Sequence, residues 1–132
     1  MTPEERKQYV EYRIDSAYKT VEAAKLLSDR GFWNSAINRL YYAIFYAVNA
    51  LLVLNDIPTK SHSATKSKFS QHFIKTGKID KKYGKLLAQL YDWRQKGDYE
   101  NIFDYDEESV KPLFKPVNEM IDIIEQEIKN AL

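Results

Sequence analysis

The chain has 132 residues, enough for one domain with one hydrophobic core, and its hydrophobic content of 44% is ordinary for a folded protein. It contains no cysteine, which excludes disulfide bonds, thiolate metal sites and cysteine nucleophiles. The net charge is only +1, but residues 60–85 hold eight lysines and one acid, whereas residues 98–132 hold ten acids and three lysines. Such a basic centre is typical either of a nucleic-acid interface or of a solvated helix face that pairs with an acidic one.

The first thirty residues predict one long helix. Thr2, Pro3 and Glu5 have the spacing of a capping box with proline in the first helical position. The apolar residues that follow recur at intervals of three and four: Val10, Ile14, Ala17, Val21 and Ala24. The helix should run to about Ser28 and stop at Gly31. Because the charged N-terminus lacks an apolar segment typical of signal peptides, we expect a cytoplasmic protein.

A second helix, roughly Asn34 to Asn55, is apolar on most sides and should be the most buried element. The longest apolar stretch of the chain, around Leu40 to Leu54, is short for a membrane span and carries several polar groups, so we expect no membrane association. The polar residues of this helix form a single stripe: Ser35, Asn38, Arg39, Tyr42, Tyr46 and Asn49. Hydrogen bonds within the monomer are one interpretation of this stripe. A dimer interface or a ligand groove is the other, because tyrosine and arginine anchor interfaces.

The segment "NDIPTKSHS" should break the chain before a short third helix, about Ser63 to Lys75, that ends at Gly77. A fourth helix should begin at Asp80, a good N-cap residue, and fray near Gly97. One stripe of this helix carries Tyr83, Leu87, Leu90 and Arg94. This spacing predicts that an arginine faces the interior.

The segment "ENIFDYD" predicts a loop, and a last helix follows. Its apolar residues have near-regular helical spacing: Val110, Leu113, Val117, Ile121, Ile124 and Ile128. Because Pro112 and Pro116 lie inside this pattern, either the helix begins late, with Pro112 in its first turn, or it is kinked at Pro116. The whole pattern predicts an all-α, up-and-down antiparallel bundle of four long helices and one short helix, in a single domain spanning residues 1–132.

Few residues point to chemistry. The chain has no glycine-rich nucleotide loop and no zinc-protease motif, and His62 and His72 do not have the spacing of metal ligands. We therefore expect no metal and no cofactor. Arg94 is the main candidate, since an always-charged guanidinium facing the interior requires acceptors. Asp98, one turn later, predicts a structural ion pair, whereas the functional alternative is that Arg94 grips a phosphate or stabilises developing charge.

Four segments, taken together, resemble the small HEPN-domain proteins of the UPF0332 type. They are "GFWNSA", "NSAINRLYYAIFYAVNALL", "IPTKSHS" and "RQKGDY", in this order along the chain. The resemblance implies a helical bundle that forms a homodimer. It also implies kinship with HEPN toxins, many of which are metal-independent RNases encoded beside a minimal nucleotidyltransferase that acts as antitoxin. In those toxins an R-x(4–6)-H motif supplies an arginine for the phosphate charge and a histidine for acid–base transfer.

The resemblance places Arg94 on the arginine of that motif. In one register Tyr99 takes the position of the histidine, and in another Asp98 and Tyr99 match the final "x-Y" and Gly97 takes it. Neither register contains a histidine, and tyrosine is a poor base near neutral pH. His62, in the matching "KSHS" segment, would replace it if the fold brings the two residues together. Capping or packing is the other role open to His62.

Three functional hypotheses follow. In the first, a HEPN homodimer binds RNA or a nucleotide: Arg94, Lys60 and the neighbouring lysines meet phosphate, Tyr42 and Tyr99 line the groove, and Asn38 and Arg39 contribute to binding. In the second, the bundle is a non-catalytic partner module of a minimal nucleotidyltransferase. In the third, it is a structural dimeric bundle.

Overall fold

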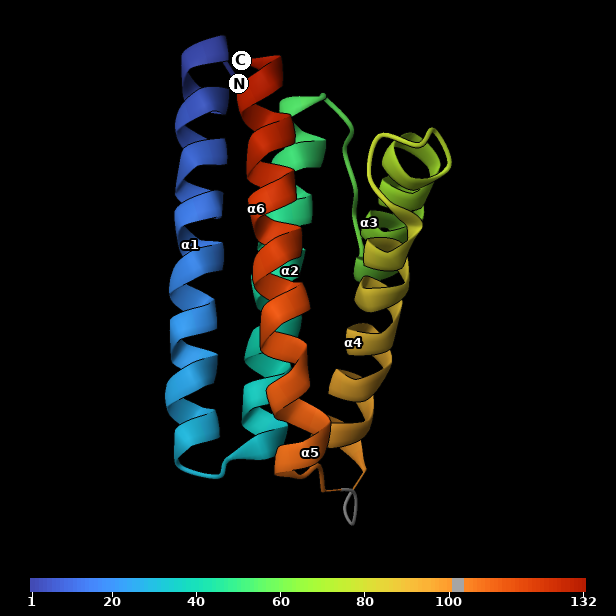
Figure 1. Cartoon of the computed structure of the whole chain (residues 1–132). Helices are drawn as coiled ribbons and strands as arrows, with labels where there is room; N and C mark the ends of the chain where they lie inside the picture. The colour runs from blue at the N-terminus through green and yellow to red at the C-terminus, as the bar shows by residue number, and fades with distance from the viewer. Residues whose placement is uncertain (101–103) are drawn as a thin grey trace.

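The computed structural model describes residues 1–100 and 104–132, a part of the chain that contains helices and no strand (Figure 1). Four long helices run alternately up and down, as predicted: α1 (Pro3–Asp29), α2 (Trp33–Leu54), α4 (Lys81–Tyr99) and α6 (Phe114–Ala131). The two chain termini lie side by side at one end of the bundle (Figure 1). The middle of the predicted loop "ENIFDYD", residues 101–103, lies outside the described residues.

The capping box predicted for α1 is present. The Thr2 hydroxyl accepts a hydrogen bond from the Glu5 backbone N–H at 3.1 Å, and the Glu5 carboxylate accepts one from the Thr2 N–H at 3.0 Å. The whole predicted apolar stripe is buried, together with Ser28. The chain leaves α1 through Gly31, whose φ of 77° favours glycine.

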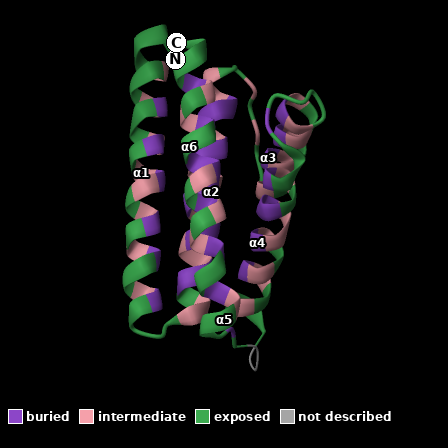
Figure 2. Cartoon of the chain, viewed as in Figure 1, coloured by how far each residue is buried: buried purple, intermediate pink, exposed green. Residues whose placement is uncertain are grey.

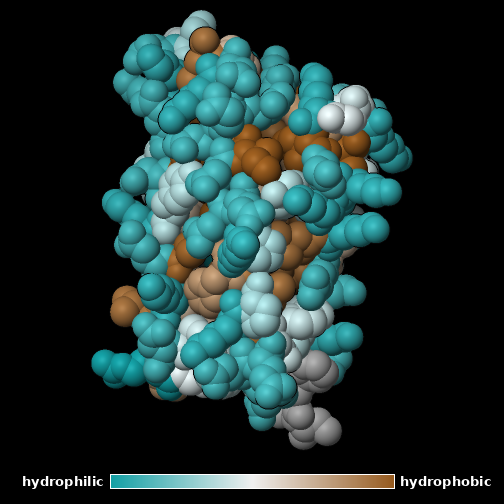
Figure 3. All heavy atoms as spheres, viewed as in Figure 1, coloured by the Kyte–Doolittle hydropathy of each residue, from teal (hydrophilic) through white to brown (hydrophobic). Residues whose placement is uncertain are grey.

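Helix α2 is the central element and packs against α1, α4 and α6. Eleven of its residues are buried, and the buried positions face inward from every helix of the bundle (Figure 2). Among the described residues α2 alone is long and apolar enough to cross a membrane, but 56% of its apolar window is buried inside the bundle. Packing in the core of the bundle therefore accounts for the high apolar content of α2. The face that carries α1 and α6 is mostly hydrophilic, with hydrophobic atoms visible between the helices (Figure 3).

The short helix α3 (His62–Phe69) begins slightly earlier than predicted, because the Ser61 hydroxyl caps it by accepting from the Ala64 N–H at 3.0 Å. A π-helical turn, Ser70–Ile74, continues it. This turn packs closely on α4, where a Cβ at Gly84 would lie 3.2 Å from Ile74 Cγ1.

The start of α4 agrees with the prediction, but its end does not. Asp80 caps the helix by accepting from the Lys82 N–H at 2.9 Å. The helix then passes through Gly97 to Tyr99 instead of fraying at the glycine. Contacts from distant segments stabilise this turn, since Asn34 donates to the Gly97 carbonyl at 3.3 Å and the Tyr105 ring packs where a side chain would lie. Tertiary packing here overrides the low helix propensity of glycine.

The two prolines near the C-terminus are accommodated without a kink inside a long helix. A single turn, α5 (Glu107–Val110), is followed by a 3₁₀ turn, Lys111–Leu113, that contains Pro112. Helix α6 begins only at Phe114, so Pro116 falls in its first turn, where backbone N–H groups lack acceptors within the helix. The helix therefore begins late, as the first alternative predicted, but Pro112 lies in the preceding 3₁₀ turn and not in the first turn of the helix.

Candidate functional site

Arg94 projects from α4 into a cage of aromatic rings and is only 8% exposed, as its spacing predicts. Its guanidinium carbon lies 5.1 Å from the ring centroid of Tyr41, 5.6 Å from that of Tyr42 and 5.9 Å from that of Tyr91. A cation over an aromatic face gains roughly 0.5 to 2 kcal/mol, with the larger values where water is excluded. The cage therefore stabilises the positive charge but supplies no hydrogen-bond acceptor for it.

The acceptors available to Arg94 are few. Its Nη1 lies 3.7 Å from Asp98 Oδ2, close enough for an ion pair but too far for a hydrogen bond. Its Nε is enclosed and has no hydrogen-bond partner among the described residues. A guanidinium removed from water requires such partners, so the charge and the hydrogen-bonding capacity of Arg94 are only partly satisfied.

Asn38 connects Asp98 to a second arginine. Its amide donates to Asp98 Oδ2 at 2.9 Å, while its carbonyl accepts from Nε and Nη2 of Arg39 at 3.0 and 2.8 Å. The Arg39 guanidinium carbon lies 5.1 Å from the ring centroid of Tyr42. An open groove between α2 and α4 is lined by Asn38, Arg39, Gly97 and Asp98 among others. The structure thus brings three of the predicted ligand-binding residues, Asn38, Arg39 and Tyr42, beside Arg94.

His62, the first residue of α3, packs against the same aromatic cluster. Its ring stacks on Phe45 with the centroids 4.4 Å apart, and its Nδ1 lies 2.6 Å from the Tyr41 hydroxyl oxygen. Since Arg94 also lies over the ring of Tyr41, both residues contact one tyrosine. His62 therefore packs in the aromatic cluster, as one of its two predicted roles requires, and is held there by Tyr41.

The surroundings determine the charge states of these groups. Burial lowers the pKa of His62 below its usual 6.5, and the positive charge of Arg94 lowers it further. The imidazole is therefore neutral near pH 7 and able to accept a proton. Burial raises the pKa of Tyr41, an effect that Arg94 opposes in part, so this phenol stays protonated.

Two predicted site residues lie apart from this cluster. Tyr99, in the last turn of α4, is 71% exposed, and Lys60 is exposed in the segment before α3. Within residues 1–100 and 104–132, neither has a hydrogen bond or an ion pair to the cluster.

The sequence analysis missed Tyr41 and Tyr91, which form the walls of the cage. Spacing offered a signal for both, since Tyr91 precedes Arg94 by three residues and Tyr41 follows Asn38 by three. In the part of the chain that the structure describes, no three histidine or acidic side chains gather as a metal site.

Comparison with known proteins identifies the family. The HEPN domain matches residues 10–128. The chain belongs to the HEPN family. It is 35% identical to a "UPF0332 protein" of Thermotoga maritima over 126 residues, 96% of each chain. It is also similar to two proteins of Methanocaldococcus jannaschii, "Putative toxin MJ0142", 34% identical over 81% of this chain and 73% of the relative, and "Putative toxin MJ0605", 28% identical over 96% and 93%. The HEPN match includes all the residues of the Arg94 cluster.

Proposed function

We propose that this HEPN protein is the toxin-type member of a toxin–antitoxin pair and that it binds RNA through a phosphate group held by Arg94. The observation that carries the proposal is the incomplete pairing of a guanidinium that is 92% buried in an aromatic cage. A phosphate would supply the acceptors that Arg94 lacks, since the guanidinium fork matches phosphate oxygens. Two relatives that are named as toxins support the same class of function.

The groove between α2 and α4 is the route to this arginine. It is lined by Arg39, a second cation, and by Asn38, an amide that donates to phosphate oxygens. Asp98 lies on the same groove and repels an anion, so binding requires a phosphate that outcompetes one carboxylate 3.7 Å from Arg94. Exposed Tyr99 follows one residue later on α4 and would contact the RNA outside the cage.

His62 would then serve in metal-independent cleavage. In this step the RNA 2′-oxygen attacks the adjacent phosphorus and the bond from phosphorus to the 5′-oxygen breaks. The departing 5′-oxygen takes a proton from water, and the imidazolium returns its proton to the hydroxide formed, so that a 2′,3′-cyclic phosphate and a 5′-hydroxyl result. The imidazole would take the proton of the 2′-hydroxyl on Nε2, in the tautomer whose Nδ1 donates to Tyr41. Arg94 would stabilise the extra negative charge on the phosphorane oxygens.

The proposal includes partners. A second copy of the chain would cover the tyrosine-rich stripe of α2, where Tyr42 and Tyr46 are half-buried, and a minimal nucleotidyltransferase would act as antitoxin in the cytoplasm. Solution mass by light scattering tests the homodimer. Co-expression with a nucleotidyltransferase encoded beside this protein, followed by co-purification, tests the antitoxin.

The central experiment measures binding and cleavage of labelled single-stranded RNA in the presence of EDTA. Arg94→Met is the test variant, because methionine fills the cage without charge, and Asp98, which loses its ion-pair partner, still accepts a hydrogen bond from Asn38. Arg30→Met, at the exposed end of α1, removes the same charge elsewhere.

We expect Arg94→Met to lose RNA binding and Arg30→Met to retain it, with both variants folded by circular dichroism. Wild-type protein that fails to bind RNA would contradict the proposal and favour the non-catalytic partner module. RNA binding without cleavage would support the phosphate site but not the role of His62.

A further inference from the structure

A second groove lies between α3, the π-helical turn that follows it and the first half of α4. Its lining includes four lysines, which we call the groove lysines: Lys66, Lys75, Lys81 and Lys85. Three serines also line it, at positions 63, 67 and 70, and its remaining lining residues are glycine or apolar. No carboxylate lines this groove, so it presents cations and hydroxyl groups over an apolar floor.

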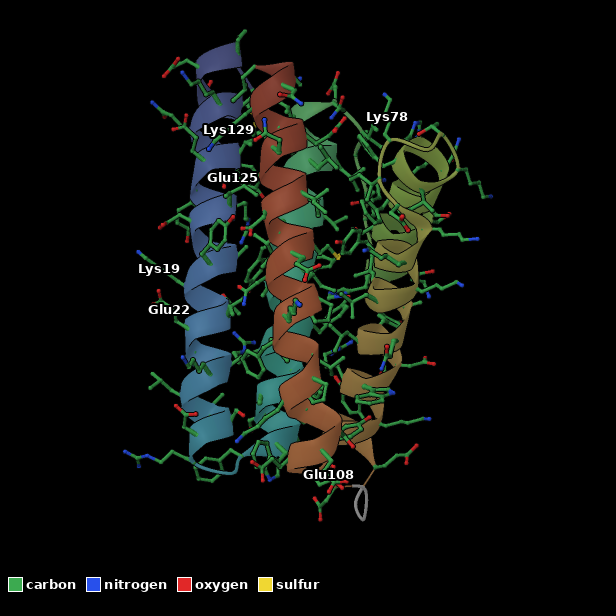
Figure 4. All side chains as sticks on the ribbon, viewed as in Figure 1. Lys19, Glu22, Lys78, Glu108, Glu125 and Lys129 are labelled. Carbon is green, nitrogen blue, oxygen red and sulfur yellow. The ribbon has the colours of Figure 1, made fainter. Side chains whose placement is uncertain are left out.

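The positive charge of this groove is not neutralised within the described residues. None of the groove lysines forms an ion pair there, and the ion pairs present involve other basic residues. Figure 4 shows Lys78, from the loop beside this groove, and Glu108, from α5, at opposite ends of the bundle. Among residues 1–100 and 104–132, no lysine of the basic segment 60–85 forms an ion pair with an acid of the C-terminal segment, which leaves the groove lysines available for an external anion.

The groove leads toward Arg94. Lys66 Nζ lies 4.8 Å from the ring centroid of Tyr91, and the same ring lies 5.9 Å from the guanidinium carbon of Arg94. At a rise of about 1.5 Å per residue, Lys85 and Arg94 are separated by roughly 14 Å along α4. Tyr91 thus contacts both Lys66, at the groove, and Arg94, in the aromatic cage.

We propose that this groove binds the sugar–phosphate backbone of a single-stranded RNA, another phosphate of which is held by Arg94. The inference rests on the proposed function and extends it by assigning the path of the strand beyond the Arg94 site. Proteins that bind single strands combine a positively charged groove with aromatic side chains on which bases stack. Here the groove lysines supply the first feature, and the half-buried ring of Tyr91, beside Lys66, supplies the second.

The test compares two variants with the same change in charge. The groove variant carries K66Q, K75Q, K81Q and K85Q. The control variant carries four lysines outside the groove, changed in the same way: K25Q, K68Q, K78Q and K82Q. Binding of single-stranded RNA is measured over a range of salt concentrations, and thermal unfolding by circular dichroism verifies the fold of both.

Each phosphate contact adds about 0.7 to the slope of log affinity against log salt for single strands. We therefore expect the groove variant to reduce the slope by about 3, at 0.7 for each of four lysines, and the control variant to change it much less. Equal reductions in both variants, or an unchanged slope in the groove variant, would overturn the groove assignment while leaving the Arg94 site standing. Absence of RNA binding by the wild-type protein would overturn both proposals.

Polyglutamate serves as a second probe, since an acidic protein segment would also suit these lysines. We expect it to bind the wild-type protein much more weakly than RNA does. Polyglutamate binding that equals RNA binding and is lost in the groove variant would overturn the RNA assignment and identify an acidic protein as the occupant.

Discussion

The hydroxyl oxygen of Tyr41 lies 2.6 Å from Nδ1 of His62. The phenol is protonated, so it can donate to an unprotonated Nδ1, and its oxygen can equally accept from an Nδ1–H. Both the neutral imidazole and the imidazolium can carry a proton on Nδ1, so either form of the ring can donate to the tyrosine oxygen. The hydrogen bond by itself therefore does not decide the charge of His62. Burial and the positive charge of Arg94 decide it.

The first prediction concerns the pKa of His62. Two causes lower the pKa of His62: burial, which is the larger, and the positive charge of Arg94. Replacing Arg94 by methionine removes the second cause and leaves the first. We expect the pKa of His62 to rise in Arg94→Met but to stay below 6.5. Titration of the ring signals by NMR measures it, and His72→Gln assigns them.

The control for this measurement is Arg30→Met, which removes an arginine from the exposed end of α1. We expect the pKa of His62 to be the same in this variant as in the wild type. If Arg94→Met leaves the pKa unchanged, the guanidinium does not act on the imidazole, and the cluster described above is not a single electrostatic unit.

The second prediction is a pH dependence of stability. The pKa of His62 is lower in the folded chain than in the unfolded chain, where it is about 6.5. As the pH falls through 6.5, the unfolded state therefore binds a proton first, and the free energy of unfolding decreases until the pH reaches the folded pKa. Above 6.5 this contribution is fully present. Urea unfolding on both sides of this value should show a larger loss at acidic pH for the wild type than for His62→Gln, and equal losses would contradict the prediction.

Helical spacing was sufficient to predict much of this molecule. The buried face of α1 follows from apolar residues at intervals of three and four, and the same rule placed Arg94 inward because Leu87 and Leu90 share its stripe. The ion pair with Asp98 also follows from local spacing, since residues four apart on a helix are neighbours.

Features that depend on contacts between helices could not be predicted in this way. Spacing relates Tyr91 to Arg94 and Tyr41 to Asn38, but the closing of both rings around the guanidinium follows only when α2 and α4 are packed together. The contact between His62 and Tyr41 depends on the path of the loop before α3, which has no periodicity. The predicted fraying at Gly97 was wrong because Asn34, 63 residues away in the sequence, donates to the Gly97 carbonyl.

The third prediction separates the roles open to Asp98. Asp98→Asn retains the size of the side chain and one acceptor oxygen but removes the negative charge beside Arg94. We expect tighter RNA binding, because a repulsive carboxylate has left the groove. The free energy of unfolding should decrease by about 1 to 2 kcal/mol, because Arg94 loses its counter-charge.

The matched control is Asp92→Asn, which removes the same charge from an exposed position on α4. We expect it to change RNA affinity less than Asp98→Asn does. Weaker RNA binding by Asp98→Asn would contradict the proposed competition between phosphate and carboxylate, and unchanged binding with loss of cleavage would assign Asp98 to the catalytic step.

The fourth prediction concerns the end of α4. A Cβ at Gly97 would lie 3.3 Å from Cε2 of Tyr105, whose ring stacks on Trp93 with the centroids 4.9 Å apart. Alanine at this position gains up to about 1 kcal/mol of helix propensity but meets this tight contact, so the two effects should nearly cancel in Gly97→Ala. Leucine does not fit beside the ring, and Gly97→Leu should lower the free energy of unfolding by about 1 to 3 kcal/mol.

Unfolding by urea measures the stability of these variants, and near-ultraviolet circular dichroism reports on the stacked rings of Trp93 and Tyr105. Lys96→Leu adds the same side chain at the neighbouring exposed position and should change stability by less than about 0.5 kcal/mol. The near-ultraviolet signal should change in Gly97→Leu and persist in Lys96→Leu, because only the first side chain displaces the Tyr105 ring. Equal stability of the two leucine variants would mean that α4 frays at Gly97 after all, and that Asn34 and Tyr105 do not hold its last turn.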